Sequence, residues 1–246
     1  KLFCYWVSSQ CLFAGRADCE YPLDKTLILI FIIKTIREVI TNMKAKTIWL
    51  VIPCYNEQEV LPETSKQLRS IMHGLVEKGK ISSESRIAFV NDGSKDMTWN
   101  IISQLHEEDV VFTGINLAHN RGHQNALLAG LMTAKDYADA AISLDADLQD
   151  DVGAIEQFID KFLEGKDIVY GVRSTRATDT VFKRGTAHAF YKIMKIMGAD
   201  TLEDHADYRL MSKRALEGLS QFKEVNLFLR GIVPMIGYET DVVYYE

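Results

Sequence analysis

The stretch Ala140-Ala-Ile-Ser-Leu-Asp145-Ala-Asp147-Leu-Gln149 is an apolar run that ends in two aspartates. Alternate side chains of an extended chain point the same way, so Asp145 and Asp147 can both face one hard divalent cation. A cation held in this way suits the binding of a diphosphate. Because Asp-x-Asp also occurs in ordinary solvated turns, the interpretation depends on the segments that precede it.

Two earlier segments have the same form. Residues 47–53 run from β-branched residues into Pro53, which we expect to end the strand, and residues 86–91 are followed directly by Asp92. Both patterns predict strands that end in polar loops. Ligands of open α/β sheets lie beyond the carboxyl ends of the strands. We therefore expect three polar strand ends to meet in one nucleotide-binding cleft.

The rest of the chain alternates between strand and helix patterns. This rhythm predicts an α/β fold with a mostly parallel central sheet sandwiched by helices. Expected helices cover residues 59–78, 96–106, 122–135, 151–163, 180–197 and a segment that ends at 219, and further strands cover 110–116, 140–145, 167–171 and 208–211. Small residues at Ala126, Ala129 and Gly130 predict that the helix over 122–135 packs closely on the sheet.

The order of the motifs resembles glycosyltransferase family 2, whose fold is the nucleotide-diphospho-sugar transferase fold called GT-A. Later motifs resemble the branch that contains dolichol-phosphate mannosyltransferase and the bacterial polyprenyl-phosphate (bactoprenol) glycosyltransferases, and the resemblance covers about residues 46–246. The motifs are Pro53-Cys-Tyr55-Asn56-Glu57, Asn91-Asp92-Gly93-Ser94-x-Asp96, Asn120-x-Gly122-x-x-x-Ala126-x-x-x-Gly130, Asp145-Ala-Asp147-Leu-Gln149-Asp150, Gly171-Val-Arg173, Phe182-Lys183-Arg184, Asp207-Tyr-Arg209-Leu and Phe228-Leu-Arg230-Gly231.

The resemblance implies a metal-dependent hexosyltransferase with a nucleoside-diphosphate sugar as donor. Asp145 and Asp147, the DXD motif, would bind Mg²⁺ or Mn²⁺, which neutralises the departing diphosphate. Simpler explanations stay open for two motifs, since Asn56 can cap a helix that has Glu57 in its first turn, and an Asx-turn explains Asp92 and Gly93. The donor-binding residues implied are Pro53, Tyr55, Asn56, Glu57, Asp92, Asp145 and Gln149.

His119 and His123 have a spacing that is compatible with zinc. The segment lacks the glutamate of the metalloprotease motif and a convincing third ligand. We therefore assign no zinc site to it, and we take the helix that begins near Gly122 as an architectural element.

Three arginines are the predicted binding residues for the acceptor. Arg173, Arg184 and Arg230 match positions that resemble the phosphate-binding arginines of polyprenyl-phosphate glycosyltransferases, and guanidinium groups bind phosphate bidentately. Each also has a simpler explanation as a surface charge or, for Arg230, a helix-end cap. Asp147 and Asp207 are the expected catalytic residues, and Asp207 acts either as a base or as electrostatic support for an oxocarbenium-like state. A phosphate acceptor is already a nucleophile at neutral pH, so a strong base is not obligatory.

The composition is that of a globular protein and argues against some classes of partner. The 246 residues are 47% hydrophobic, which is enough for a substantial core. A net charge of −6 without a sustained basic stripe argues against a nucleic-acid partner. Cys54 stands alone outside the first 42 residues, so we expect no disulfide framework and a reducing compartment. The sequence is compatible with a homo-oligomer and does not decide the oligomeric state.

We expect the chain to differ from the family at both of its ends. We expect residues 1–42 to be an N-terminal extension of uncertain status, with Met43 as the native start and 43–246 as the catalytic domain. An interfacial or packing helix over 26–40 is the alternative, since the apolar run 27–33 is too short to span a bilayer. Bacterial members of the branch continue past the equivalent of Glu246 into transmembrane helices, and we expect this C-terminal membrane segment to be absent here.

The predicted function is the transfer of a sugar, with inversion, from a nucleoside-diphosphate sugar to a polyprenyl phosphate. UDP-glucose is the first donor to test. The expected location is the cytoplasmic face of the cell membrane, with this chain itself soluble or peripheral. Two alternatives stay open. One is a glycosyltransferase that acts on a saccharide acceptor in cell-surface polysaccharide synthesis. The other is a truncated, non-catalytic remnant that only binds nucleotide sugar.

Overall fold

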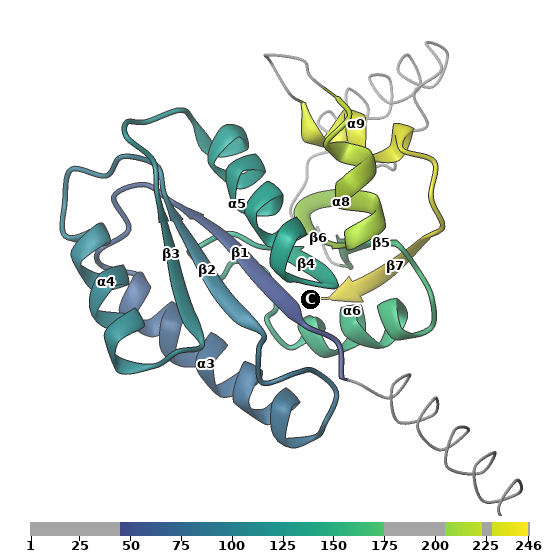
Figure 1. Ribbon diagram of the computed structural model, residues 1–246, viewed down its shortest axis with the longest axis horizontal. Coiled ribbons are helices and arrows are strands. Elements are labelled where there is room, and N and C mark those ends of the chain that lie inside the picture. Colours follow the sequence, from purple (N-terminus) through teal and green to yellow (C-terminus); the bar gives the residue numbers. More distant parts are fainter. Residues whose placement is uncertain (1–44, 175–204, 223–227, 246) are drawn as a thin grey trace, which may run out of the picture. The chain divides into compact units, whose positions relative to one another are not determined.

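A computed structural model describes residues 45–174, 205–222 and 228–245, all of which belong to one compact unit, Ala45–Glu246 (Figure 1). Several expectations lie outside these residues. They are the N-terminal extension and its alternative helix, the start at Met43, the helix over 180–197, and Arg184.

The described residues form a seven-stranded sheet with the strand order β3-β2-β1-β4-β6-β5-β7. Strand β6 is antiparallel to both of its neighbours, β4 and β5, and all other neighbouring strands are parallel. The prediction of a mostly parallel sheet is confirmed. The strands are β1 Ile48–Cys54, β2 Arg86–Asn91, β3 Phe112–Asn116, β4 Ala140–Ser143, β5 Ile168–Arg173, β6 His205–Ser212 and β7 Thr240–Tyr245.

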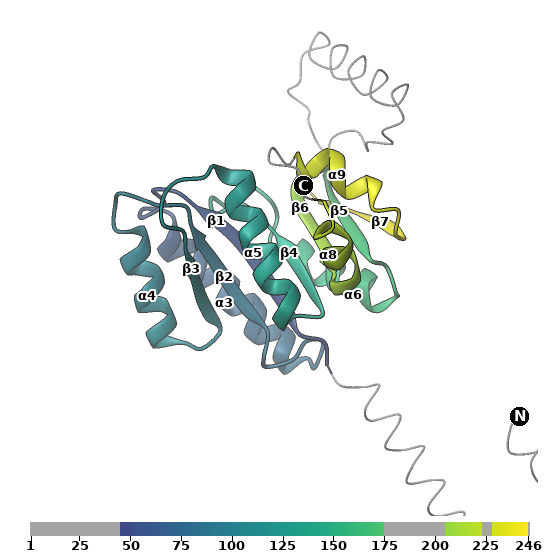
Figure 2. The ribbon, with the colours of Figure 1, turned by 45° about the horizontal axis from the view of Figure 1, so that its top comes forward.

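Helices cover both faces of the sheet (Figures 1 and 2). Helices α3, α4 and α6 pack on one face, and α5, α8 and α9 pack on the other. The sequence patterns predicted no element beyond Leu219, so β7 and α9 are new. The helices are α3 Leu61–Glu77, α4 Thr98–Glu108, α5 His123–Tyr137, α6 Ala154–Leu163, α8 Lys213–Leu219 and α9 Leu229–Met235. Within the described ranges, none of the helices combines the length and the apolarity needed to cross a bilayer.

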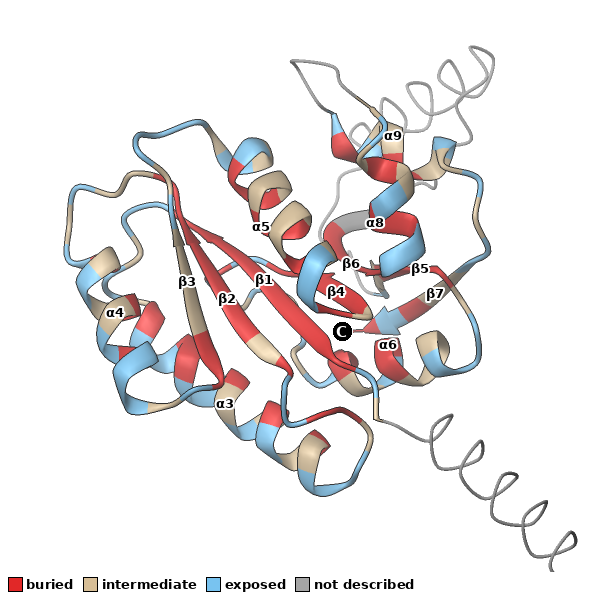
Figure 3. Ribbon diagram, viewed as in Figure 1, coloured by how far each residue is buried: buried red, intermediate tan, exposed pale blue. Residues whose placement is uncertain are grey.

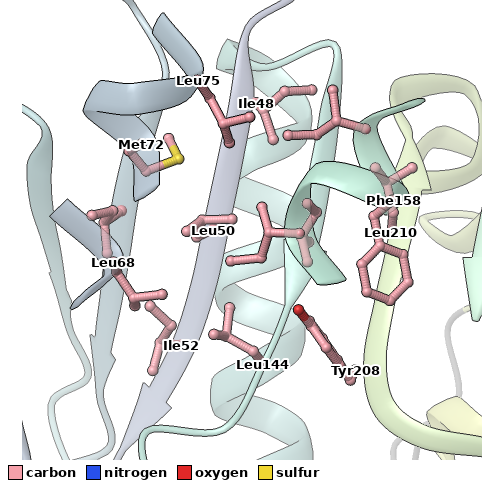
Figure 4. Packing of buried hydrophobic residues seen from close by; sticks show 14 of the residues in the cluster. Ile48, Leu50, Ile52, Leu68, Met72, Leu75, Leu144, Phe158, Tyr208 and Leu210 are labelled. Carbon is pink, nitrogen blue, oxygen red and sulfur yellow. The ribbon is translucent and has the colours of Figure 1, made fainter. Parts of the chain in front are cut away.

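Strand β1 shows how the sequence produces this layering. All seven of its residues are buried, as expected for a central parallel strand (Figure 3). Ile48, Leu50 and Ile52 join the core on the α3 side, where Figure 4 shows them beside Leu68, Met72 and Leu75. Trp49 and Val51 join the core on the α5 side. The alternation of apolar side chains along one strand therefore fills both layers.

Strand direction brings the polar strand ends together. The parallel strands β1, β2 and β4 end at the same edge of the sheet. Because β6 runs the other way, its first residues lie at that edge too. Ser143, the last residue of β4, pairs with Arg209 of β6, and continuing this register by two residues brings Asp207 level with Asp145. The fold thus places Asp145 and Asp207 at the same edge of the sheet, on neighbouring strands.

Helix α5 approaches the sheet closely at Gly130. A Cβ atom at this position would lie 2.4 Å from Val51 Cγ1 and 2.7 Å from Val90 Cγ2. Both valines are fully buried. The predicted close packing of α5 is confirmed, and Gly130 is the residue that permits it.

Gly130→Ala should therefore lower the free energy of unfolding by about 1–3 kcal/mol through overpacking of the core. The matched control is Gly74→Ala in α3, where no described heavy atom lies within 4 Å of the added Cβ. That variant should raise the free energy of unfolding by about 0.5–1 kcal/mol, because alanine is the better helix former. Urea denaturation measures both, and shifts of the same sign would contradict the packing argument.

Candidate active site

The loops that follow β1 and β2 are joined by hydrogen bonds. Asn56 has a left-handed backbone (φ 58°), its N–H donates to Ser94 Oγ (2.9 Å), and its Oδ1 accepts from the N–H of Lys95 (2.8 Å). Helix α3 begins only at Leu61. The alternative that Asn56 caps this helix with Glu57 in its first turn is therefore wrong, because the Asn56 side chain is used by the neighbouring loop.

The first donor motif has a buried and an exposed part. Pro53 is buried inside β1, which continues to Cys54, so the proline does not stop the strand as predicted. Tyr55 and Asn56 are exposed at the strand end, and Glu57 is half-buried. The exposed residues are the ones that a nucleotide can reach, and their contacts with a donor stay a prediction.

Asp145 and Asp147 are exposed just beyond β4, and Ala146 between them is buried. This is the alternation that the sequence predicted. Thr64 Oγ1 of α3 donates to the carbonyl oxygen of Ala146 (2.6 Å), which fixes the backbone between the two carboxylates. Burial and the nearby charges of Asp147, Asp96 and Asp145 raise the pKa of Glu57. Negative charge is therefore concentrated at this edge of the sheet.

This donor set fits a hard divalent cation. No group of three His, Cys, Asp or Glu side chains suited to a metal occurs in the part of the chain that the structure describes. The protein would thus supply the carboxylates of Asp145 and Asp147, and phosphate oxygens and water would supply the rest. Such a mixed shell is the usual one for Mg²⁺ at a substrate phosphate.

The segment from Asp145 to Asp151, here called the acidic loop, also contains Gln149. Its Nε2 donates to Asp147 Oδ2 (2.7 Å), so Gln149 lies beside the predicted metal ligand as the resemblance implied. Arg173, which was predicted to bind the acceptor phosphate, donates from Nη2 to the carbonyl oxygen of Gln149 (2.7 Å) and to Asp150 Oδ1 (3.0 Å). The structure therefore brings Arg173 to the acidic loop.

Asp92 is 2% exposed, and its carboxylate accepts two backbone hydrogen bonds, from the N–H of Arg121 (2.6 Å) and of Gly122 (2.9 Å). Gly93 makes the turn with a positive φ of 65°. The turn itself is closed by Asn91, whose Oδ1 accepts from the N–H of Ser94 (3.2 Å). Asp92 thus holds the loop that leads into α5, and its contact with a nucleoside stays a prediction.

The first turn of α5 links the two halves of the site. His123 Nε2 lies 3.1 Å from Asp145 Oδ1, and Gln124 Nε2 donates to Asp207 Oδ2 (3.1 Å). The hydrogen bond to Asp145 raises the pKa of His123, although burial opposes the shift. The sequence suggested His123 only as a zinc ligand, which was rejected, and did not mark Gln124, because a helical pattern does not tell which strand end the first turn faces. Their place directly after Gly122 of the third motif was the available signal.

Asp207 lies at the centre of a charged cluster. It is 6% exposed and pairs with Arg209, which is 1% exposed. Arg230 binds it bidentately, through Nε (3.3 Å) and Nη2 (3.2 Å). Burial raises the pKa of Asp207, but the hydrogen bond from Arg230 and the charges of both arginines outweigh this effect and hold the pKa below its ordinary value. Asp207 is therefore a carboxylate at neutral pH.

Arg230 is the second residue of α9, so its alternative role as a cap of a helix end is wrong, because its guanidinium reaches back to Asp207. Gln124 Oε1 and Arg209 Nη1 are buried around the same carboxylate without a hydrogen-bond partner among the described residues. Buried polar atoms are normally paired. The cluster is thus equipped to receive further polar groups.

A comparison with sequence families agrees with this geometry. The sequence model of the family described as "Glycosyl transferase family 2" matches residues 49–220. The chain belongs to glycosyl transferase family 2.

Individual members of the family are also similar. The "uncharacterized glycosyltransferase YkoT" of Bacillus subtilis (strain 168) is 52% identical over 197 residues, which cover 80% of this chain and 58% of that protein. The "bactoprenol glucosyl transferase" of Shigella phage SfV is 39% identical over 197 residues, with coverages of 80% and 62%. The resemblance to the polyprenyl-phosphate branch is confirmed. The aligned part spans 58% and 62% of the length of these two relatives.

Solved structures show the same fold at low sequence identity. Glucosyl-3-phosphoglycerate synthase from Mycobacterium tuberculosis, in complex with Mn²⁺, UDP-glucose and phosphoglyceric acid, has a TM-score of 0.52 at 14% identity, with 81% of this chain and 70% of that chain covered. The mannosyltransferase PcManGT from Pyrobaculum calidifontis has a TM-score of 0.51 at 16% identity, with coverages of 82% and 57%. The predicted GT-A fold is confirmed.

The Asp207 cluster predicts a specific pH dependence of stability. The pKa of Asp207 in the folded protein lies below the unfolded value of about 3.9. Its ionised form therefore stabilises the fold above that pH, and this contribution is lost as the pH falls through the lower folded pKa. At pH 7, Asp207→Asn should lower the free energy of unfolding by about 3–5 kcal/mol, because it leaves the buried Arg209 charge unpaired.

Urea denaturation at several pH values between 7 and 3 measures this difference, which should shrink below about pH 4 because the carboxyl of the unfolded wild type takes up a proton there while the folded one is still ionised. The control is Glu164→Gln, which removes a surface ion pair with Lys161 and should leave stability almost unchanged. A difference that stays constant across the whole pH range would contradict the assignment of a lowered pKa to Asp207.

Proposed function

We propose that the chain transfers a sugar, with inversion, from a nucleoside-diphosphate sugar to a polyprenyl phosphate at the cytoplasmic face of the membrane. The observation that carries the proposal is the juxtaposition of two sites at one edge of the sheet. Asp145 would provide an oxygen ligand for a cation, and Asp207 with its two arginines forms a cluster of net positive charge. The first turn of α5 contacts both. A diphosphate held on one side would lie beside a phosphate held on the other.

The donor would lie across the ends of β1, β2 and β4. Tyr55, Asn56 and Glu57 are suited to the base and ribose, and the resemblance to the family assigns Asp92 to the nucleoside. Mg²⁺ or Mn²⁺ on Asp145 and Asp147 would supply Lewis-acid stabilisation of the departing nucleoside diphosphate. Gln149 orients Asp147 toward that group. UDP-glucose is the first donor to test, since the similar phage protein is named a glucosyl transferase.

Asp207 is best suited to a positioning role. A carboxylate whose pKa is lowered is a weak base, and efficient general bases have pKa values near the working pH. A phosphate monoester, with its second pKa of about 6, is largely dianionic at neutral pH and needs no strong base. We therefore assign Asp207 to hold Arg230, whose side chain is 46% exposed, in the orientation that binds the acceptor phosphate.

The identity of the acceptor is supported by similarity to the bactoprenol glucosyl transferases, which are 39–41% identical to this chain. Arg230 and Arg184 are the arginines we assign to its phosphate, and bidentate guanidinium groups suit that geometry. A saccharide acceptor and a binding-only remnant are the alternatives, and transfer assays separate all three outcomes.

Asp145→Ala and Asp147→Ala should each abolish the metal-dependent part of nucleoside diphosphate binding and leave the fold intact, because both side chains are exposed at a strand end. Isothermal titration calorimetry with uridine diphosphate, in the presence and absence of Mn²⁺, measures this. Asp136→Ala is the matched control, an exposed aspartate in the last turn of α5. Wild-type affinity in both variants would rule out the metal assignment.

Arg230→Ala should slow sugar transfer to a short-chain polyprenyl phosphate in detergent by about tenfold to over a hundredfold, since a hydrogen bond to a charged group contributes about 1.5–3 kcal/mol. Donor affinity should barely change. Arg230→Lys should restore the rate only in part, because an ammonium group cannot make two parallel hydrogen bonds. Arg86→Ala, at the opposite end of β2, is the control.

The assay follows radiolabelled sugar into the lipid extract and, in parallel, into a saccharide acceptor. Lipid product that depends on Arg230 supports the proposal. Label in the saccharide alone would establish the alternative acceptor, and nucleotide binding without any product would establish the non-catalytic remnant.

A further inference from the structure

The acidic loop needs support from outside itself. It connects the short strand β4 to α6, and Asp147 and Gln149 are exposed. Leu148 between them has a left-handed backbone, with φ 51°. This conformation is unfavourable for a residue other than glycine by about 1–3 kcal/mol, and it persists only where the surroundings fix it. The contacts that fix it are therefore part of the site.

Two of these contacts converge on Asp150, whose side chain is 10% exposed. The hydroxyl of Tyr245, the last residue of β7, donates to Asp150 Oδ1 (2.5 Å). Arg173, the last residue of β5, donates to the same oxygen (3.0 Å) and to the carbonyl oxygen of Gln149 (2.7 Å). One carboxylate thus ties the loop to the ends of two strands.

A second tyrosine holds the far end of the loop. Tyr208 of β6 donates from its hydroxyl to the carbonyl oxygen of Asp151 (3.1 Å). Its ring packs edge-on against Phe158, with ring centroids 4.6 Å apart, and against Tyr245, at 5.4 Å (Figure 4 shows Tyr208 and Phe158). Tyr208 is 1% exposed and Tyr245 is 4% exposed. Burial of both rings leaves their hydroxyls little freedom to move away from the loop.

Gly171 makes room for this arrangement. A Cβ atom there would lie 3.0 Å from Tyr245 Cε1 and 3.1 Å from Tyr208 Cδ1. The glycine in β5 therefore allows both rings, whose hydroxyls hold the loop, to lie against the strand.

We propose that Tyr245 is a positioning residue of the donor site. Through Asp150 it holds the acidic loop in the conformation in which Asp147 and Gln149 meet the cation and the diphosphate. Because the loop is already ordered before the ligand binds, binding does not have to include the entropic cost of ordering it, and the affinity is higher. The same contacts give Arg173 a positioning role on the loop in place of the acceptor contact predicted from the sequence. The proposal rests on the proposed function, since it assumes the metal and diphosphate site.

Tyr245→Phe tests the proposal, because it removes the hydroxyl and keeps the ring. The matched control is Tyr244→Phe on the same strand, where the side chain is 67% exposed. Calorimetry with uridine diphosphate and Mn²⁺ should show about tenfold weaker binding for Tyr245→Phe, the loss expected for one hydrogen bond to a charged group, and wild-type binding for Tyr244→Phe. The affinity for uridine alone should be equal in all three proteins.

The outcomes separate this proposal from the function on which it rests. If the wild type binds uridine diphosphate no better with Mn²⁺ than without it, the proposed metal site is wrong. If the wild type shows the metal effect and Tyr245→Phe binds as tightly as Tyr244→Phe, only the positioning role is wrong.

Hydrogen exchange of the metal-free protein gives a readout that does not depend on any ligand. Backbone amides of residues 145–153 should exchange faster in Tyr245→Phe than in Tyr244→Phe, whereas those of β1 should be unchanged. Equal exchange in the loop would overturn the proposal. Should Tyr245→Phe fail to fold, Tyr208→Phe removes the second hydroxyl that holds the loop and should shift both measurements in the same direction, and wild-type values in that variant would also overturn the proposal.

Discussion

Strand direction is the constraint on which the rest of the structure depends. Parallel strands deliver their carboxyl ends to one edge of a sheet, and in this chain the ends of β1, β2 and β4 carry the polar motifs. The antiparallel strand β6 begins at the same edge. Asp207 therefore lies level with Asp145, although the two residues are far apart in the sequence. With β6 parallel, Asp207 would lie at the opposite edge, and the acidic loop and the arginine cluster would be about one strand length apart.

Electrostatics divides this edge into two regions of different character. Around the acidic loop, burial and the charges of Asp147, Asp96 and Asp145 raise the pKa of Glu57. Around Asp207, two arginines outnumber one carboxylate. The first region attracts a cation and the second an anion. Helix α5 joins the two regions, since His123 contacts Asp145 and Gln124 contacts Asp207. A shift of this helix would therefore change the contacts of both carboxylates.

The sequence predicted the central elements well, because apolar runs such as 86–91 are bounded by polar residues that mark the strand ends. It did not predict β7, whose pattern is weak because an edge strand is only partly buried, nor α9, a seven-residue helix that contains Pro234. The exposure of Asp145 and Asp147 followed from the period of a strand. The partners of Arg173 and Arg230 could not be predicted in this way, because both arginines pair with carboxylates 23 residues away through contacts that only the tertiary fold creates. The alternative role of Asn56 as a helix cap was wrong for the same reason.

Leu148 has a consequence for how this protein can change during evolution. Its side chain packs against the apolar core on the α3 and α6 side, while its backbone sets the direction of Asp147 and Gln149 on either side of it. Glycine would adopt this backbone more easily but would lose the anchor. Substitutions in the core beneath Leu148 would therefore alter the proposed donor site even though they lie outside it, so that stability and the proposed donor recognition would evolve as linked traits at this point of the fold.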